Sequence, residues 1–313
     1  MDFFTASIVF IISLFGLVKG ADFLIQGAER VGRYFQMPPF VIGALIVGVG
    51  TSLPEVASSF AALFAEENQI VVANAVGSNI ANILLVIGLS AVVGQRIVST
   101  KNLTDIEVPL LISATALFIG TAYDGIVTQS EAAILFLGFI IYLSYLLIHP
   151  DESGDNQNPE EPKVTKLVAK DFVMLIGGGL ALAFGAKYLI DAVVAFGTIF
   201  GIPTGIIAIS AVAVGTSLPE ILVSITAVLR GKTDMAIGNV FGSNIFNILL
   251  MVGLVGLFSD LSIDEQTFSV GLPFLGAITI LFMVSALSKR IHIWEGLFYL
   301  LIYLFFMLKI FGF

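Results

Sequence analysis

The 313-residue sequence contains no cysteine, which excludes disulfide bonds and thiolate metal sites. Charged residues make up only 12% of the chain, whereas a soluble domain usually carries about 25%. Lysine and arginine are outnumbered 14 to 23 by aspartate and glutamate, and the net charge of −9 argues against a nucleic-acid partner. The chain is instead 58% hydrophobic with a mean hydropathy of +1.03, which is typical of a membrane protein.

Apolar runs long enough to cross a bilayer recur along the whole chain. A membrane-spanning helix needs about 20 mostly apolar residues. Splitting the chain at its polar stretches predicts an all-α polytopic membrane protein with ten transmembrane helices, near residues 4–28, 39–65, 70–94, 104–122, 129–148, 168–194, 203–229, 235–258, 267–288 and 291–311.

The two halves of the chain match each other at a constant spacing of 165 residues. Between residues 74–89 and their counterparts, 11 of 16 positions are identical. Chance does not give one constant spacing over a long stretch, so we infer a duplicated five-helix unit. The Pro-rich and acidic segment between the halves is predicted to be a flexible linker. The predicted units are the first repeat, the linker and the second, inverted repeat, at 1–148, 149–167 and 168–313.

Basic residues gather in alternate connections between the predicted helices. Of 14 lysines and arginines, 11 lie in the odd-numbered connections or at the helix ends that flank them, namely Arg30, Arg33, Arg96, Lys101, Lys163, Lys166, Lys170, Arg230, Lys232, Lys289 and Arg290. The positive-inside rule makes these connections cytoplasmic, so we expect a plasma-membrane protein with extracellular termini and a cytoplasmic linker. Because each repeat has an odd number of helices, the repeats would be inverted, as is typical of secondary transporters.

The hexapeptide GTSLPE occurs at 50–55 and again at 215–220, inside two apolar segments. A carboxylate at the centre of a membrane helix costs several kcal/mol, so it usually has a partner or a function. Pro54 and Pro219 each remove a backbone donor, so nearby carbonyl oxygens can turn toward a cavity. Helical spacing places four positions of each copy on one face, namely Gly48, Thr51, Ser52 and Glu55, and Ala213, Thr216, Ser217 and Glu220.

The predicted helices 70–94 and 235–258 each add a polar stripe with a spacing of four residues. The stripes are Asn74, Ser78 and Asn82, and Asn239, Ser243 and Asn247. With the hexapeptides they supply only oxygen donors, which favours Ca²⁺, Na⁺ or, less well because it dehydrates reluctantly, Mg²⁺. A structural interpretation also stays open, because serine and threonine can bond the carbonyl four residues earlier. For Asn74 and Asn239 we expect a role in linking helices.

The segments GTSLPE and GSNIANILLVIG in the first half, and GTSLPE and GSNIFNILLMVG in the second, resemble the two α-repeats of the sodium/calcium exchanger family of cation/calcium antiporters. The resemblance implies an antiporter, not an enzyme, that exchanges Na⁺ for Ca²⁺ by alternating access. The two long helices that open the repeats would slide across the core. No cofactor is implied, since Ca²⁺ and Na⁺ are substrates. In its lipid bilayer the protein is expected to work as a monomer, without an obligatory protein partner.

The resemblance also carries the family's ion ligands over to matching positions of this sequence. Glu55 and Glu220 would bridge a Ca²⁺ site and two Na⁺ sites. Hydroxyls, carbonyls and amide oxygens would complete the sites from Thr51, Ser52, Thr216, Ser217, Gly48, Ala213, Ser78, Asn82, Ser243 and Asn247.

Position 247 bears on the driving ion. The potassium-dependent branch of the family has aspartate there, so Asn247 argues against K⁺. Asn82 and Asn247 cannot titrate, which favours Na⁺ over H⁺. A Ca²⁺/H⁺ antiporter stays the alternative, since Glu55 and Glu220 can take protons. A cation channel, the alternative from another class, would need a continuous pore. A third Na⁺, beyond the two that the glutamates balance, would make the exchange electrogenic.

Overall fold

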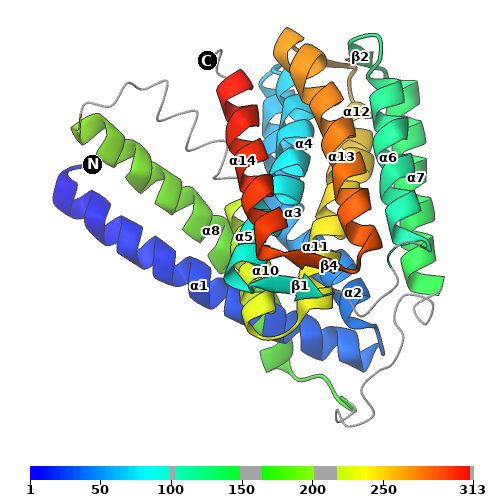
Figure 1. Cartoon of the computed structure of the whole chain (residues 1–313). Coiled ribbons are helices and arrows are strands. Elements are labelled where there is room, and N and C mark those ends of the chain that lie inside the picture. Colours follow the sequence, from blue (N-terminus) through cyan, green and yellow to red (C-terminus); the bar gives the residue numbers. More distant parts are fainter. Residues whose placement is uncertain (99–102, 104, 149–163, 201–216, 311–313) are drawn as a thin grey trace.

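The computed structural model describes residues 1–98, 103, 105–148, 164–200 and 217–310. Ten helical segments, joined by turns and short strands, build this part of the chain (Figure 1). Eight of them are long and apolar enough to cross a membrane, and the segments Glu107–Thr121 and Leu218–Leu229 are shorter apolar helices. The predicted all-α, ten-helix membrane fold is confirmed.

Several of the segments contain a turn of π-helix, labelled η, in which the backbone is wound more widely. The first half of the chain consists of α1 (Phe3–Tyr34), α2 (Pro39–Val41), η1 (Ile42–Val47), α3 (Gly48–Phe64), α4 (Gln69–Ala81), η2 (Asn82–Val86), α5 (Ile87–Val93), β1 (Arg96–Val98), α6 (Glu107–Thr121), β2 (Ile126–Val127) and α7 (Gln129–Ile148). The second half consists of α8 (Ala169–Ile199), α10 (Leu218–Leu229), α11 (Thr233–Ile245), η3 (Phe246–Met251), α12 (Val252–Gly256), β3 (Leu261–Ser262), η4 (Thr267–Gly271), α13 (Leu272–Leu287), β4 (Arg290–His292) and α14 (Ile293–Ile310).

Helices α1 and α8 pack against each other and run in opposite directions (Figure 1). Toward one end of the pair, the ring centroids of Phe3 and Phe196 are 5.7 Å apart. Toward the other end, Arg30 of α1 pairs with Asp171 of α8 at 3.2 Å. The two helices open the two halves of the chain, so their antiparallel packing is the packing of inverted repeats.

Two small antiparallel sheets join the halves, and their pairing is reciprocal. Strand β1 pairs with β4 through Ile97 and Ile291, and β2 pairs with β3 through Ile126 and Ser262. Ser262 and Ile291 lie 165 residues after Ile97 and Ile126, respectively. Each half therefore contributes equivalent strands to both sheets, as in contacts across a two-fold axis. The sheets lie toward opposite ends of the bundle, with β2 at the top of Figure 1 and β1 with β4 below.

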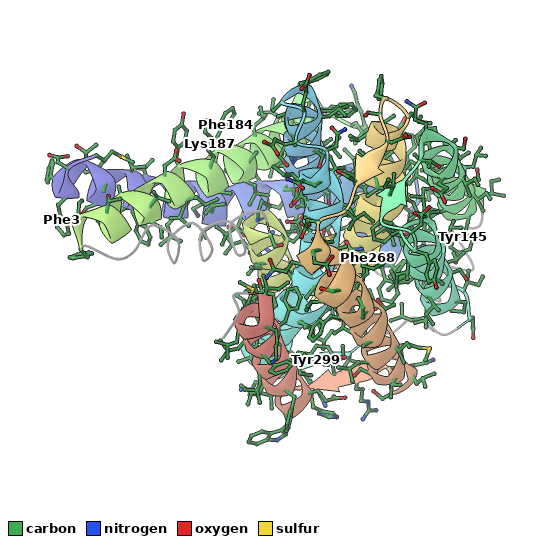
Figure 2. All side chains as sticks on the ribbon, turned by 90° about the horizontal axis from the view of Figure 1, so that it is seen from above. Phe3, Tyr145, Phe184, Lys187, Phe268 and Tyr299 are labelled. Atoms are coloured by element: carbon green, nitrogen blue, oxygen red, sulfur yellow. The ribbon has the colours of Figure 1, made fainter. Side chains whose placement is uncertain are left out.

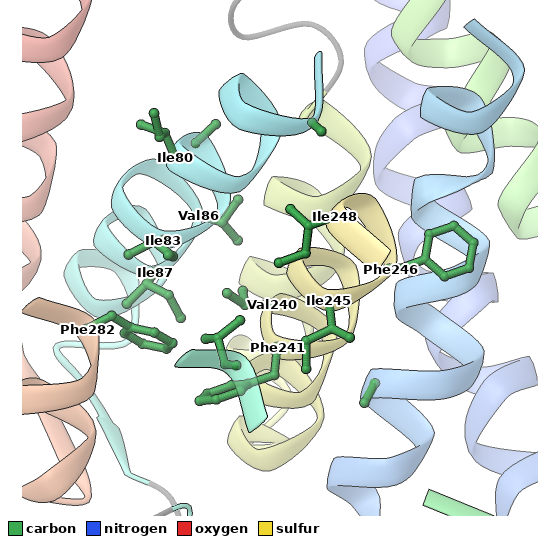
Figure 3. Packing of buried hydrophobic residues seen from close by; sticks show 14 of the residues in the cluster. Ile80, Ile83, Val86, Ile87, Val240, Phe241, Ile245, Phe246, Ile248 and Phe282 are labelled. Atoms are coloured by element: carbon green, nitrogen blue, oxygen red, sulfur yellow. The ribbon is translucent and has the colours of Figure 1, made fainter. Parts of the chain in front are cut away.

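The centre of the bundle is formed by the segments Gln69–Val93 and Thr233–Gly256. Figure 3 shows Ile83 and Ile87 of the first segment beside Val240 and Ile245 of the second, where they exclude water from the core. Of the eight long apolar helices, the second segment is the most enclosed: 94% of its most apolar stretch is buried, against 22% for the outer helix α14. The outer helices instead expose apolar side chains that a lipid bilayer would cover, as the sticks of Figure 2 show.

Two helices run further than the sequence predicts. Helix α1 ends at Tyr34 rather than near residue 28, and α8 ends at Ile199 rather than near residue 194. Arg30 and Arg33 were expected in a connection, but both lie in the last turns of α1. They are tolerated there because Arg30 reaches Asp171, while Arg33 pairs with an acidic residue one turn earlier.

Candidate cation-binding site

Glu55 of α3 and Glu220 of α10 come from opposite halves of the chain and lie close together inside the bundle. Ser52 precedes Glu55 by nearly one turn, and its hydroxyl donates a hydrogen bond to Glu220 Oε1 over 3.3 Å. Glu55 is 2% exposed and Glu220 is 1% exposed. Both carboxyl groups are therefore removed from water, where a charge without a partner is costly.

Several buried oxygens on α3, at the start of α10 and on the π-helical turns η3 and η2 that contact these helices have no hydrogen-bond partner among the described residues. They belong to both glutamates, one serine and two asparagines, namely Glu55 Oε2, Glu220 Oε2, Ser217 Oγ, Asn82 Oδ1 and Asn247 Oδ1. Buried polar atoms in native proteins are nearly always paired, so each exception requires an explanation. Oxygen is the ligand type that hard cations prefer, and a cation held among these atoms would satisfy them.

A backbone carbonyl adds to the same set of oxygens. The carbonyl oxygen of Gly48 accepts hydrogen bonds from Thr51 Oγ1 over 3.3 Å and from Ser243 Oγ over 3.4 Å. Ser243 reaches it because α11 packs directly on the backbone of η1. A Cβ atom at Gly242 would lie 2.1 Å from the carbonyl oxygen of Ala44. Glycine at position 242 thus allows the two helices, one from each half, to bring their polar groups together.

The π-helical turns coincide with the polar positions of the site. Turn η1 ends directly before Gly48, η2 begins at Asn82, and η3 contains Asn247. Such turns change the direction of backbone and side-chain groups and are frequent at functional sites. The sequence pointed to a disturbance at Pro54, but α3 continues through this residue. The irregular backbone lies upstream of the proline, at the end of η1.

Asn74 and Asn239 link helices, as predicted. Asn74 Nδ2 donates to Ser59 Oγ of α3 over 3.3 Å, and Asn239 Nδ2 donates to Ser224 Oγ of α10 over 3.0 Å. These are equivalent contacts in the two halves. Asn239 Oδ1 also accepts a hydrogen bond from Thr51 Oγ1 over 3.3 Å. The single O–H of Thr51 is therefore shared between this amide oxygen and the Gly48 carbonyl.

Two residues near the site escaped prediction from the sequence. Met251 Sδ accepts a hydrogen bond from Ser59 Oγ over 3.2 Å. Asn79 donates to the backbone carbonyl of Asn244 over 3.0 Å. Asn79 belongs to the repeated GSNI segment, so its recurrence was a signal. Nothing marked Met251, because its counterpart in the first half is Val86.

Of the twelve predicted ligands, those that the structure describes are all buried, and they come from both halves. They are Gly48, Thr51, Ser52, Glu55, Ser78, Asn82, Ser217, Glu220, Ser243 and Asn247. Ala213 and Thr216 lie outside the described residues. Direct contacts join Ser52 to Glu220, and Gly48 to Thr51 and Ser243.

The charge of the site is not balanced by basic side chains. In the described part of the chain, no lysine or arginine forms an ion pair with Glu55 or Glu220; its ion pairs involve other acidic residues. The same residues contain no cluster of three or more His, Cys, Asp and Glu side chains. Two carboxylates among neutral oxygens give a charge that a cation can neutralise, without a fully acidic cage.

Comparisons with known proteins bear on the family of the chain. The family model described as sodium/calcium exchanger protein matches residues 5–148 and again 170–312, once in each half. The sodium/calcium exchanger MaX1 of Methanosarcina acetivorans is 31% identical, over 97% of this chain and 98% of its own length. The inner membrane protein YrbG of Escherichia coli is 32% identical, over 88% of this chain and 87% of its own length.

Solved structures of the sodium-calcium exchanger NCX_Mj have the same fold. One, soaked with zero Na⁺ and Ca²⁺, has a TM-score of 0.80 at 32% identity and covers 97% of this chain and 98% of that chain. Another, soaked with 2.5 mM Na⁺ and 0.1 mM Ca²⁺, has a TM-score of 0.82 at 31% identity and covers 96% and 97%. Both are described as showing extracellular ion exchange and induced binding-site occlusion in that protein.

Proposed function

This chain belongs to the sodium/calcium exchanger protein family, and we propose that it is a secondary antiporter that exchanges Na⁺ for Ca²⁺ across a membrane by alternating access. The observation that carries the proposal is the buried pair Glu55 and Glu220, one from each half, on helices that contact turns with further buried oxygens lacking a partner in the described residues. Na⁺ and Ca²⁺ are then substrates, and the protein is not an enzyme and needs no cofactor.

The charge of the pair accounts for exchange. One Ca²⁺ neutralises two carboxylates, and so do two Na⁺ ions. The two kinds of ion therefore compete for Glu55 and Glu220, and the site releases one before it takes the other. A third Na⁺ on the neutral oxygens would make each cycle electrogenic. Because one charge moving through 100 mV corresponds to about 2.3 kcal/mol, an inside-negative potential would then help to export Ca²⁺.

We assign the ion ligands to both halves. The carboxylates of Glu55 and Glu220 are shared between the Ca²⁺ site and Na⁺ sites. The remaining ligands are hydroxyl, amide and carbonyl oxygens of Thr51, Ser52, Thr216, Ser217, Gly48, Ala213, Ser78, Asn82, Ser243 and Asn247. The orphaned oxygens of Ser217, Asn82 and Asn247 support this assignment.

Helices α1 and α8 are the proposed moving element. They pack mainly on each other, and α1 touches the rest of the bundle chiefly through α10 and η1. A helix pair held in this way can slide as a unit across a packed core. Since α10 carries Glu220 and η1 leads to Gly48, movement of α1 along them would change access to the site.

The distribution of charge supports an orientation in the plasma membrane. The turn between α10 and α11 carries Arg230 and Lys232 and touches β1, because Thr233 Oγ1 donates to the Val98 carbonyl over 2.7 Å. The end with β3 is acidic, and Asp260 there accepts a hydrogen bond from the backbone N–H of the first residue of α7 over 3.0 Å.

We assign the basic end and the 149–167 linker to the cytoplasm and both termini to the outside. Repeats 1–148 and 168–313 would work together as one monomer in lipid.

Flux of ⁴⁵Ca²⁺ into proteoliposomes tests the function, with Na⁺, K⁺ and H⁺ gradients imposed one at a time. We expect an outward Na⁺ gradient to drive Ca²⁺ uptake, and an inside-positive potential to accelerate it. Uptake driven by a pH gradient without Na⁺ would identify a Ca²⁺/H⁺ antiporter instead, and single-channel currents would identify a channel. Absence of uptake under every gradient would reject the proposal.

A further inference from the structure

Asn79 lies on α4, nearly one turn before Asn82, and is 1% exposed. Its side chain connects two helices. Nδ2 donates to the backbone carbonyl oxygen of Asn244 over 3.0 Å, and Oδ1 accepts from Asn247 Nδ2 over 3.2 Å. Asn247 is a proposed ion ligand and Asn79 is not. The amide of Asn79 thus joins a ligand to the backbone of α11.

These two hydrogen bonds fix the direction of both carboxamides. A carbonyl oxygen only accepts, so the end of Asn79 that faces Asn244 must be its NH₂ group. The other end of Asn79 is then an oxygen, which also only accepts, so Asn247 must present its own NH₂ group to it. Asn247 Oδ1 is left pointing away from Asn79, buried and without a partner among the described residues.

We propose that Asn79 is a positioning residue that orients the carboxamide of Asn247 so that its oxygen, and not its NH₂ group, faces the transported cation. This inference rests on the proposed function of the site. The two ends of a carboxamide have nearly the same size, so packing alone does not choose between them. A flipped Asn247 would direct N–H donors at the cation and repel it, whereas the hydrogen bond to Asn79 excludes that rotamer.

The equivalent pair in the other half is arranged differently. Asn244 Nδ2 donates to the Val240 carbonyl in its own helix over 2.7 Å. Asn244 Oδ1 and both polar atoms of Asn82 have no partner in the described part of the chain. The bond that would mirror the one between Asn247 and Asn79 would join Asn82 Nδ2 to Asn244 Oδ1. Of the two equivalent ligand positions, Asn247 is therefore held in one orientation by a described hydrogen bond and Asn82 is not. Asn244, the counterpart of Asn79, makes no such bond and is a matched control for it.

A double-mutant cycle on ion binding tests the inference. Asn79→Leu removes the donor and the acceptor with little change in size. Asn247→Asp replaces the carboxamide by two equivalent oxygens, which cannot be misoriented. The single and double variants are purified in detergent. The half-saturating Ca²⁺ and Na⁺ concentrations are then measured from the ion-dependent rise in melting temperature, which needs no turnover.

With Asn247 present, we expect Asn79→Leu to raise the half-saturating concentration of at least one of the two ions about tenfold, an effect typical of residues that orient a ligand. With Asn247→Asp, the same change should alter it by less than about twofold, as for independent sites. If Asn79→Leu changes the half-saturating concentration by the same factor with Asn247 and with Asn247→Asp, or changes it in neither, the proposal is overturned. The control Asn244→Leu should change the half-saturating concentration by the same factor in both cases. Asn79→Ala replaces the leucine variant if the latter does not fold.

The double-mutant cycle on ion binding and the flux assay test the two proposals separately. Coupling between positions 79 and 247 without Na⁺-driven ⁴⁵Ca²⁺ uptake would keep Asn79 as a positioning residue of a cation site and reject exchange. Na⁺-driven uptake without coupling would keep the exchange function and reject the role of Asn79.

Discussion

The Ser52 hydroxyl donates a hydrogen bond to Glu220 Oε1 over 3.3 Å, although 168 residues separate the two in the chain. Ser52 belongs to the first half and Glu220 to the second, and neither is more than 1% exposed. The candidate site therefore exists only where the two halves dock, and neither half contains it alone. An ion that binds there stabilises the docked molecule, so its binding can be followed through the melting temperature.

Glu55→Gln and Glu220→Gln are each expected to reduce Na⁺-driven ⁴⁵Ca²⁺ uptake to the level of liposomes without protein. Glutamine keeps the shape of the side chain but leaves only one negative charge to balance Ca²⁺ in a site away from water. The Ca²⁺-dependent rise in melting temperature should be lost as well.

A matched control for these variants is Glu107→Gln. Glu107 is also buried, at 2% exposed, but lies on α6, where Tyr145 donates to it over 2.6 Å. We expect this variant to keep its half-saturating Ca²⁺ concentration. Wild-type uptake by either Glu55→Gln or Glu220→Gln would contradict the assigned role of the pair.

Ser52 and Ser217 occupy equivalent positions but differ in their hydrogen bonds. Ser52→Ala removes the bond to the Glu220 carboxyl group, and bonds to charged groups contribute about 1.5–3 kcal/mol. Ser217 Oγ has no partner among the described residues, so Ser217→Ala removes no hydrogen bond that this part of the chain shows. In ion-free protein we expect the lower melting temperature for Ser52→Ala, whereas both variants should weaken Ca²⁺ binding. Equal melting temperatures without ions would contradict the geometry.

Much of the fold could be predicted because membrane helices and an internal repeat leave patterns that extend over many residues of the sequence. Apolar segments located ten helices, and the 165-residue spacing related Glu55 to Glu220 as two parts of one site. The strands β1 to β4 were not predicted, since two or three residues are too few for an alternating pattern. Their pairing depends on how the halves dock.

The details of the site depend on the register between helices, which periodicity does not contain. The π-helical turns at Asn82 and Asn247 leave the polar stripe unchanged in sequence but shift the direction of its side chains. The hydrogen bond between Asn79 and Asn247 joins α4 to η3, and only the docked structure brings these segments to 3.2 Å. The stripe therefore pointed to candidate ligands, but not to Asn79, which we propose orients one of them.

Gly178 and Gly177 are neighbours on α8 with opposite surroundings. A Cβ atom at Gly178 would lie 2.4 Å from the backbone nitrogen of Leu24 on α1, whereas one at Gly177 would meet no described atom within 4 Å. Gly178→Ala should therefore separate the α1–α8 pair, lowering the melting temperature and the exchange rate. Gly177→Ala should leave both nearly unchanged. A harmless Gly178→Ala would show that close packing of this pair is not needed for transport.

Two ion pairs tie α1 to the core next to the proposed cytoplasmic face. Asp22 of α1 pairs with Arg230 at 2.5 Å, and Glu29 of α1 pairs with Lys232. Both basic residues lie between α10 and α11. If α1 slides along α10 during transport, these pairs are present in one access state and broken in the other.

Asp22→Arg is therefore expected to lower the population of the state seen here. Losing a partly exposed pair costs about 0.2–1 kcal/mol. Repulsion between the introduced charge and Arg230 adds a similar amount, so the ratio of the two access states should shift by at most about thirtyfold. A contact specific to one state affects the two membrane faces oppositely: the half-saturating Ca²⁺ concentration should rise on one side of oriented vesicles and fall on the other. Adding Arg230→Asp recreates the pair with reversed charges and should restore both values. A change in the same direction on both faces, or a swap that restores neither, would mean that the pair does not distinguish the access states.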